Sequence, residues 1–222
     1  MQFTYHENAG EALLKVDIRV YEHLFKVRRL KEGSTLWWRN LCDENIYEYC
    51  VQSIGKKEAI LELLSTKSSS ITSLKKLHIG WCVIDPKIIE KTLPMLNELG
   101  VECLNFIYAD FSQKNHLLDQ ERMKRILINS SQQCGRSTWM QLQIFDTLEA
   151  YFRAYPKSAI VDFSTTKLSD LAGIASIIIG PEGGFSERER ALFANTSVFG
   201  LSCPTILRSE TAVVSVASKI LA

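Results

Sequence analysis

The chain has 222 residues, a hydrophobic fraction of 46%, a charged fraction of 23% and a net charge of +1. A globular chain of this length buries roughly 70% of its unfolded surface, so it needs neither disulfides nor a structural metal. The charge balance excludes a uniformly basic nucleic-acid binder, because the residues before Ser70 carry 10 basic and 10 acidic side chains and the remainder carry 16 and 15. Any RNA-binding surface must therefore be a local patch.

The N-terminal ten residues have neither a basic start nor an apolar core, which argues against a secretory signal. The longest apolar stretch, residues 172–179, is far too short to cross a bilayer. Six cysteines are scattered without a CxxC pair, and the four histidines lack the spacing of metal ligands. We therefore expect reduced and mostly buried cysteines, no metal site, no membrane association and a cytoplasmic location.

The N-terminal part of the chain is rich in β-branched and aromatic residues, which is typical of short strands. Residues 16–23, 34–40 and 46–55 are the strand candidates. Short strands at this spacing indicate a small barrel. The serine-rich residues 65–73 predict a linker, and we expect a barrel domain over residues 1–68 and a second domain over residues 69–222.

The second domain alternates strands and helices, which indicates a mostly parallel α/β sheet. A helix is expected to begin at Asp85 and Pro86, to be kinked or shortened by Pro94, and to stop at Gly100. Its apolar stripe comprises Ile88, Ile89, Leu96 and Leu99. The remaining strand candidates are residues 77–84, 101–107, 159–163 and 176–180, and a polar helix is expected over residues 119–135, with Met123, Ile126 and Leu127 on one face.

Two more helix starts follow from capping signals. Ser186 with Glu189 forms a capping-box pattern, and Ser209 is expected to cap a final helix. The small and β-branched residues of that last helix predict close packing against another helix.

The segment IIIGPEGGFS, residues 177–186, predicts a ligand site, because a buried strand runs through a glycine-rich turn into a capped helix. Ligands of open α/β sheets bind beyond the carboxyl ends of strands, and glycines allow the backbone to approach them closely. Neither GxGxxG nor the Walker pattern is present, and the charge of Glu182 disfavours a polyphosphate. A tight turn without a ligand is the alternative.

Two further segments place an arginine near a helix end. In PTILRSETA, residues 204–212, Arg208 precedes a helix start, where backbone N–H groups bind anions well. In QQCGR, residues 132–136, Arg136 is expected to be exposed beyond the end of a helix. For the first segment taken alone, a capped helix with a surface arginine is the favoured alternative.

Taken together, IGPEGGFS and ILRSETA resemble the RsmE-type family of ribosomal RNA uridine methyltransferases in the SPOUT class. NELGV at residues 97–101 and QQCGR follow the order of that family, and EHLFKVRRLKEGS at residues 22–34 is similar to its N-terminal stretch. The resemblance implies a PUA-like β-barrel followed by a SPOUT methyltransferase domain of α/β class with a C-terminal trefoil knot.

The resemblance also implies S-adenosylmethionine as the cofactor, held by three loops of the knot. On this sequence the loops correspond to the turn near Phe163 and Ser164, the glycine turn and residues 201–208. The implied cofactor-binding residues are Phe163, Ser164, Ile179, Gly180, Pro181, Gly183, Gly184, Leu201, Ile206, Leu207 and Ser209.

The family methylates N3 of one uridine in 16S rRNA of the small ribosomal subunit and acts as a homodimer, with the helix at residues 211–217 suited to the interface. N3 must lose its proton, which leaves negative charge on the ring carbonyls that an arginine can stabilise. Arg208 or Arg136 is the candidate for this role, and Glu182 is a candidate base or orienting group.

RNA contact is assigned to a basic segment with interleaved aromatic residues, for which a solvated strand edge is the alternative. Its basic residues are Arg19, Lys26, Arg28, Arg29 and Lys31. Two departures from the family pattern are the Leu201-Ser202 pair, where relatives often have Leu-Gly, and the absence of the arginine that family members commonly carry near the N-terminus. The rival functions are a SPOUT enzyme that methylates another base or a ribose oxygen, a non-catalytic RNA-binding module and a plain nucleotide-binding α/β protein.

Overall fold

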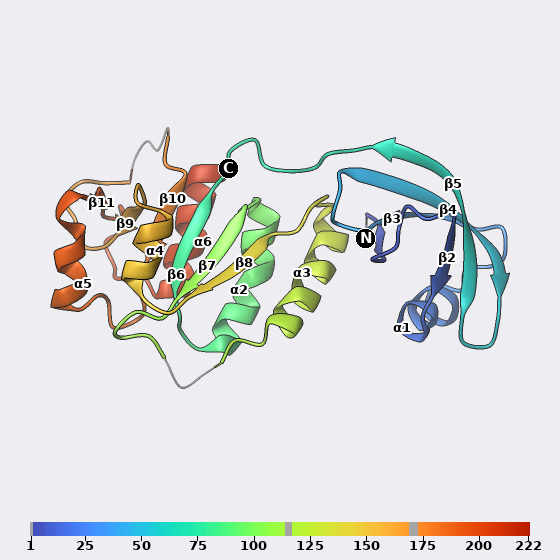
Figure 1. The fold of residues 1–222 in the computed structure, drawn as a ribbon, viewed down its shortest axis with the longest axis horizontal. Coiled ribbons are helices and arrows are strands. Elements are labelled where there is room, and N and C mark those ends of the chain that lie inside the picture. The colour runs from blue at the N-terminus through green and yellow to red at the C-terminus, as the bar shows by residue number, and fades with distance from the viewer. Residues whose placement is uncertain (1, 114–116, 169–172) are drawn as a thin grey trace. The chain divides into compact units, whose positions relative to one another are not determined.

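The computed structural model describes residues 2–113, 117–168 and 173–222, and Figure 1 shows the course of the chain. Two compact units make up the chain. The N-terminal unit comprises the residues up to Thr72 together with Ile128–Trp139, and the C-terminal unit comprises Ser73–Leu127 and Met140–Ala222. None of the described helices is long and apolar enough to cross a membrane.

The N-terminal unit is built on a five-stranded sheet in the order β1-β3-β4-β5-β2. Its strands are β1 (Thr4–Tyr5), β2 (Leu13–Val16), β3 (Thr35–Arg39), β4 (Asn45–Ile54) and β5 (Ala59–Ser68). All pairings are antiparallel except that of β1 with β3, and register shifts interrupt the long β4–β5 hairpin. Such irregularities bend a hairpin, so that one face of the sheet can enclose Trp38, Tyr49 and Leu61, which are fully buried.

Two predictions for this unit are wrong. Residues 16–23 are not one strand: β2 ends at Val16, and a short helix, α1 (Ile18–Tyr21), continues as a π-helix, η1 (Glu22–Val27). The helical spacing lets Tyr21 and Leu24 both enter the core, and the Tyr21 hydroxyl donates to the carbonyl of Gly55 at 2.8 Å. The predicted linker also begins too early, because β5 continues through Ser68.

The C-terminal unit contains a six-stranded parallel sheet in the order β11-β9-β10-β6-β7-β8. The strands are β6 (His78–Cys82), β7 (Cys103–Ile107), β8 (Gln141–Phe145), β9 (Ala159–Val161), β10 (Ser176–Ile179) and β11 (Val198–Phe199). Every residue of β7 and β10 is buried, as expected for parallel strands covered on both faces. The predicted parallel α/β sheet is therefore confirmed.

The helices are α2 (Pro86–Leu99), α3 (Gln120–Cys134), α4 (Leu148–Ala154), α5 (Glu187–Ala191), the 3₁₀-helix η2 (Leu192–Asn195) and α6 (Ser209–Leu221). The predicted limits of α2 are confirmed: the Asp85 carboxylate accepts from the N–H of Lys87, and Gly100 is left-handed with φ of 89°. The helix nevertheless continues past Pro94. Burial of Leu93 and Leu96 on either side offsets the roughly 3 kcal/mol that an internal proline costs.

Part of each predicted apolar face is confirmed. Ile89 and Leu96 of α2 are buried, whereas Ile88 and Leu99 are only half-buried. On α3, Met123 and Leu127 are buried and Ile126 is half-buried.

Helix α6 packs against α2 and β10 within the same unit. Its fully buried residues are the small or β-branched Val213, Val216 and Ala217. The predicted packing of this helix against another helix is therefore satisfied inside the chain. The knot expected in this region stays a prediction, because its path includes residues 169–172, which lie outside the described residues.

Candidate functional site

A pocket of about 700 Å³ lies beyond the carboxyl ends of β9, β10 and β11. Its volume falls within the range of roughly 300–1,000 Å³ that is typical of small-ligand sites. Three segments of the C-terminal unit form it: residues 161–167, residues 179–185 and residues 200–209. The pocket is thus where the topology of an open α/β sheet places a ligand.

All eleven predicted cofactor-binding residues line this one pocket. They are Phe163, Ser164, Ile179, Gly180, Pro181, Gly183, Gly184, Leu201, Ile206, Leu207 and Ser209. Two of the three candidate catalytic residues, Glu182 and Arg208, line it as well. Both are exposed, Arg208 with 80% of its side chain, so they are accessible from solvent.

The glycine turn requires glycine for identifiable reasons. The N–H of Gly184 donates to the carbonyl of Pro181 at 2.9 Å, and Gly184 has φ of 71°, which disfavours any residue with a Cβ. A Cβ at Gly180 would stand 3.0 Å from the ring of Phe185, and a Cβ at Gly183 would stand 3.1 Å from Phe111. These contacts place the turn close against the side chains beneath it.

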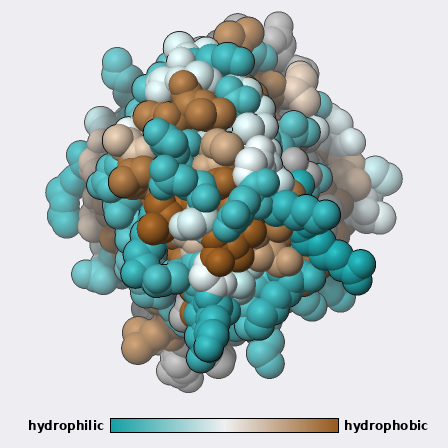
Figure 2. Space-filling view, turned by 90° about the vertical axis from the view of Figure 1, so that its right-hand side faces the viewer, coloured by the Kyte–Doolittle hydropathy of each residue, from teal (hydrophilic) through white to brown (hydrophobic). Residues whose placement is uncertain are grey.

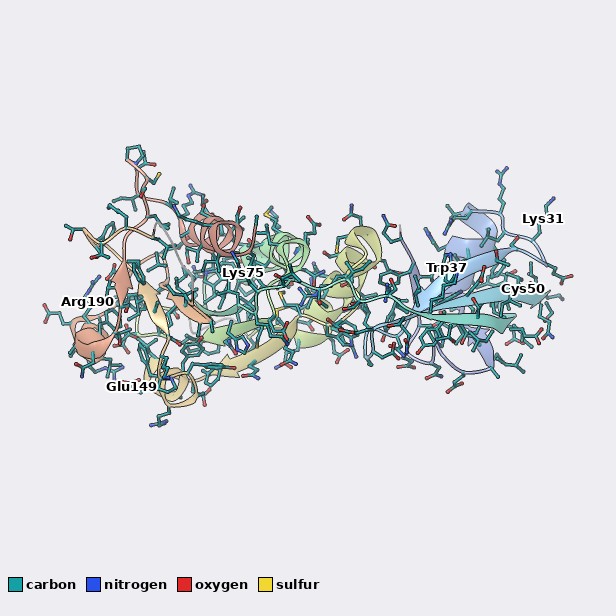
Figure 3. The ribbon with its side chains drawn as sticks, turned by 90° about the horizontal axis from the view of Figure 1, so that it is seen from above. Lys31, Trp37, Cys50, Lys75, Glu149 and Arg190 are labelled. Atoms are coloured by element: carbon teal, nitrogen blue, oxygen red, sulfur yellow. The ribbon has the colours of Figure 1, made fainter. Side chains whose placement is uncertain are left out.

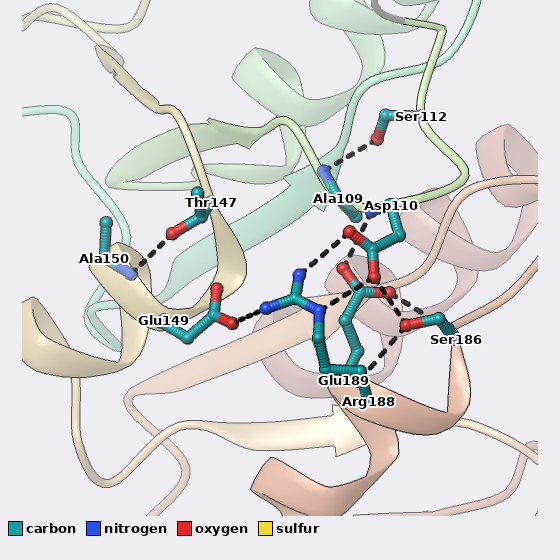
Figure 4. Close-up of polar contacts among 9 residues, drawn as sticks. All are labelled: Ala109, Asp110, Ser112, Thr147, Glu149, Ala150, Ser186, Arg188 and Glu189. Atoms are coloured by element: carbon teal, nitrogen blue, oxygen red, sulfur yellow. Dashed lines mark hydrogen bonds and ion pairs between the residues drawn. The ribbon is translucent and has the colours of Figure 1, made fainter.

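The carboxylate of Glu189 binds the backbone at the end of the glycine turn (Figure 4). Glu189 is 1% exposed, and its two oxygens accept from the backbone N–H groups of Ser186, at 3.0 Å, and Asp110, at 2.8 Å. The Ser186 hydroxyl in turn accepts from the N–H of Glu189, which confirms the predicted capping box. Because Asp110 follows β7, this carboxylate joins the start of α5 to the loop after β7.

Arg188 extends the same network (Figure 4). It pairs with Asp110 at 2.9 Å and with Glu149 in the first turn of α4, and the Ser186 hydroxyl donates to Asp110 at 2.6 Å. A hydrogen bond from its own backbone N–H, followed by the Thr147 hydroxyl and Arg188, lowers the pKa of Glu149 in spite of burial. The glycine turn is therefore supported by charged groups from three elements.

Two pocket residues that the sequence analysis missed tie the first segment to the glycine turn. Arg190 of α5 pairs with Asp162, and its Nε donates to the carbonyl of Phe185 at 3.2 Å. The Asp162 side chain is only 8% exposed, whereas that of Arg190 is 44% exposed. Figure 3 shows Arg190 at α5, in the C-terminal unit. The sequence signal for Asp162 was a carboxylate directly after a buried strand.

Gly200, also missed, joins the first segment to the third. Its N–H donates to Thr166 at 2.8 Å, and its carbonyl accepts from Leu168 at 3.0 Å. A Cβ at this position would stand 2.3 Å from the carbonyl oxygen of Ser164, so only glycine allows this approach. A glycine directly after the short apolar β11 was the available sequence signal.

Ser209 does not cap α6, contrary to the prediction. Arg208 occupies the cap position without a side-chain bond, and Ser209 is the first helical residue. Its hydroxyl instead donates to the carbonyl of Gly180 at 2.6 Å and accepts from the indole N–H of Trp81 at 2.8 Å. Tertiary contacts thus outweigh the local preference of serine for the cap.

Several pocket side chains face solvent. Phe163 and Ile206 are 76% and 81% exposed, and Cys203 is exposed as well. Hydrogen bonds from the side chain and the backbone of Thr205 lower the pKa of the Cys203 thiol. The expectation of mostly buried cysteines is wrong, since only Cys82 and Cys103 are buried.

Arg136, the third candidate catalytic residue, was expected to be exposed and is 5% exposed. Its Nε donates to the carbonyl of Thr138 at 3.0 Å, and it is not among the described residues that line the pocket. Arg136 directly follows α3 and Gly135, which has φ of 91°.

The basic segment assigned to RNA lies on α1, on η1 and on the loop that follows η1, rather than on a strand edge. Lys26, Arg28, Arg29 and Lys31 are all exposed, and the side chain of Arg19 lies outside the described residues. Arg29, two residues after the end of η1, is left-handed with φ of 56°. Figure 3 shows Lys31 at the edge of the N-terminal unit. Figure 2, which views the molecule from the right-hand side of Figure 1, shows apolar side chains surrounded by hydrophilic ones.

Comparison with known proteins identifies two family matches. Residues 72–221 match the family described as RNA methyltransferase domain, and residues 17–64 match the one described as RNA methyltransferase PUA domain. The chain is 43% identical to ribosomal RNA small subunit methyltransferase E of Helicobacter pylori strain 26695, with 98% of each chain covered. It is 28% identical to ribosomal RNA small subunit methyltransferase E 1 of Borreliella burgdorferi, with 87% of this chain and 86% of that one covered.

Solved structures show the same fold. A methyltransferase of Legionella pneumophila in complex with S-adenosylmethionine has a TM-score of 0.81 at 25% identity, covering 97% of this chain and 94% of that one. Ribosomal RNA small subunit methyltransferase E of Neisseria gonorrhoeae, bound to S-adenosylmethionine, has a TM-score of 0.82 at 19% identity, covering 98% and 95%. The predicted PUA-like domain followed by an α/β methyltransferase domain is thereby confirmed. The chain belongs to the family of ribosomal RNA small subunit methyltransferases E.

Proposed function

We propose that the chain methylates N3 of a uridine in 16S rRNA of the small ribosomal subunit, with S-adenosylmethionine as the methyl donor. The observation that carries this proposal is the single pocket in which three cross-tied loops meet, in a chain whose relatives are named for this reaction class. The domain division at residues 68 and 69 and a cytoplasmic location belong to the same proposal.

The residues of the pocket fit such a cofactor. Ile179, Leu207 and Ala212 supply apolar lining, and the glycine turn contributes backbone to the same pocket. Glu182 and Gly183 occupy the centre of that turn, and we assign to their N–H groups the binding of the polar edge of the adenine. When bound, the cofactor supplies an electrophilic methyl group.

The protein's own contribution is alignment and charge stabilisation. We assign to Arg208 the stabilisation of the negative charge on the uridine carbonyls after N3 loses its proton. Arg208 lines the pocket and is exposed, whereas the buried Arg136 already donates to Thr138. We assign to the exposed Glu182 the role of accepting or orienting that proton.

RNA binding is proposed for the exposed Lys26, Arg28, Arg29 and Lys31, together with Arg19, because cations at these positions can neutralise several phosphates.

A homodimer is proposed on a separate ground. Phe163 and Ile206 are large apolar side chains that stand exposed at one pocket, and a second copy of the chain would shield them from water.

The test is titration calorimetry with S-adenosylmethionine, followed by methylation of small ribosomal subunits from a strain that lacks the enzyme. We expect saturable binding by a particle of twice the chain mass and N3-methyluridine in the digested RNA. RNA affinity without cofactor binding would favour a non-catalytic RNA-binding module. A methyl group on another base or on ribose would favour a different SPOUT activity.

A further inference from the structure

A buried serine hydroxyl joins the entrance of the glycine turn to the start of α6. Ser209 is 6% exposed, and Trp81 in the middle of the sheet is completely buried. The indole N–H of Trp81 donates to the Ser209 oxygen at 2.8 Å, and the Ser209 hydroxyl lies 2.6 Å from the carbonyl oxygen of Gly180. Three elements, β6, α6 and the end of β10, therefore meet at one oxygen atom.

Donor chemistry determines the direction of both bonds. An indole N–H can only donate, and a carbonyl oxygen can only accept. The Ser209 oxygen must therefore accept from Trp81, which leaves its single proton for Gly180. The indole thus selects one rotamer of a hydroxyl that would otherwise rotate.

The carbonyl that receives this proton lies at the entrance of the turn. Holding the Gly180 carbonyl inward fixes the peptide plane between Gly180 and Pro181, and the ring of Pro181 fixes the next φ. The bond from Gly184 to Pro181 then closes the turn. The orientation of the N–H groups of Glu182 and Gly183 consequently depends on the bond that Ser209 makes.

We propose that Ser209 and Trp81 are positioning residues that set the affinity of the glycine turn for S-adenosylmethionine, an inference that rests on the proposed function. The Ser209 hydroxyl acts inside the protein, because its proton and one acceptor site are already engaged there. Trp81 acts indirectly, because its indole N–H orients the Ser209 hydroxyl.

The experiment measures the Kd for S-adenosylmethionine by calorimetry in the parent chain and in Ser209 variants. Chemical denaturation curves first establish that each variant is folded under the conditions of the titration. Ser209→Ala removes the donor to Gly180, and we expect about a tenfold rise in Kd. Ser209→Cys, which is nearly isosteric but a weak donor, should resemble Ser209→Ala. Ser209→Thr retains the hydroxyl and should restore the affinity to within about threefold of the parent chain.

Trp81→Phe provides a second and independent variant. It removes the indole N–H but leaves the serine hydroxyl, so we expect about a threefold rise in Kd. The double variant Trp81→Phe, Ser209→Ala should bind no more weakly than Ser209→Ala, because Trp81 acts only through the hydroxyl. Trp81→Phe should also destabilise the Ser209→Ala chain less than the parent chain, since the buried indole N–H has then already lost its acceptor.

Ser176→Ala is the matched control. Ser176 lies at the other end of β10, is 9% exposed, and shares two hydrogen bonds with the hydroxyls of Tyr151 and Ser158. Its loss should lower the stability and leave the cofactor Kd unchanged.

The outcomes separate the two proposals. If the parent chain fails to bind S-adenosylmethionine, the proposed function is wrong. If the parent binds and Ser209→Ala binds equally well, or if Ser209→Thr is as weak as Ser209→Ala, the positioning role is wrong. If the serine variants do not fold, an unchanged Kd in Trp81→Phe overturns the proposal.

Discussion

Gly200→Ala tests whether the pocket depends on the close approach of its first and third segments. The added Cβ would stand 2.3 Å from the carbonyl oxygen of Ser164, whereas 3.4–4 Å is ordinary van der Waals contact. About 1 Å of separation must therefore be gained. The backbones of Gly200 and Ser164 cannot move apart freely, because Gly200 is hydrogen-bonded to Thr166 and Leu168, which closely follow Ser164 in the chain.

The cost follows from these contacts. Overpacking costs about 1–3 kcal/mol, and weakening one of the two hydrogen bonds adds about 1 kcal/mol. A loss of about 2–4 kcal/mol lowers the Tm of a chain of this size by about 4–16 °C. Gly200 does not have a positive φ, so the loss of stability in Gly200→Ala comes from steric overlap. The displaced loop should also raise the Kd for S-adenosylmethionine, by about tenfold or more.

The assay is thermal unfolding followed by circular dichroism, together with calorimetry of the folded variant. Gly55→Ala is the control, because its Cβ would stand 3.3 Å from the carbonyl oxygen of Glu58 in an exposed hairpin. We expect that variant to lose less than about 1 kcal/mol. A Gly200→Ala chain with the Tm and the Kd of the parent would refute the argument from close approach.

Four further predictions concern other parts of the chain. Arg208→Ala should abolish detectable methylation while calorimetry shows unchanged cofactor affinity and Tm, because the side chain is 80% exposed; normal turnover would remove Arg208 from the mechanism. Charge reversal of Arg28 and Arg29 should weaken RNA binding in filter assays and leave the cofactor Kd unaltered, and unchanged RNA affinity would defeat that assignment. Glu189→Gln should lower the stability in urea by about 2 kcal/mol, since an amide can accept from only one of the two N–H groups that the carboxylate satisfies; equal stability would contradict this role. Burial raises the pKa of Tyr151 to about 12, so this phenol ionises at lower pH in the unfolded chain than in the folded one. The free energy of unfolding should therefore fall by up to about 2–3 kcal/mol between pH 10 and 12. Urea unfolding should show a smaller fall in Tyr151→Phe, and identical pH profiles for the two chains would contradict this role of Tyr151.

Where predictions from sequence are correct, their determinants are local. The Asp85 cap, the left-handed Gly100 and the capping box of Ser186 and Glu189 each depend on groups within a few residues of one another. The buried strands follow from short apolar runs, and the glycine turn follows from its composition. These signals were sufficient to predict the α/β class. The residues that the family resemblance assigns to the cofactor line one pocket.

Tertiary structure decided the rest, because the partners are distant in the sequence. Ser209 favours a helix cap locally, yet Trp81, 128 residues away, and Gly180, 29 residues away, engage its hydroxyl in the interior. The pairing of Asp162 with Arg190 spans 28 residues and has no local signature.

The same reason explains the wrong predictions. The predicted strand at residues 16–23 contains β-branched and aromatic side chains, but helical spacing brings Tyr21 and Leu24 together into the core. Arg136 has the sequence context of a surface residue and is nevertheless buried. Propensity acts over a few residues, whereas the burial of a side chain depends on which distant segments fold against it, and only the assembled structure determines that.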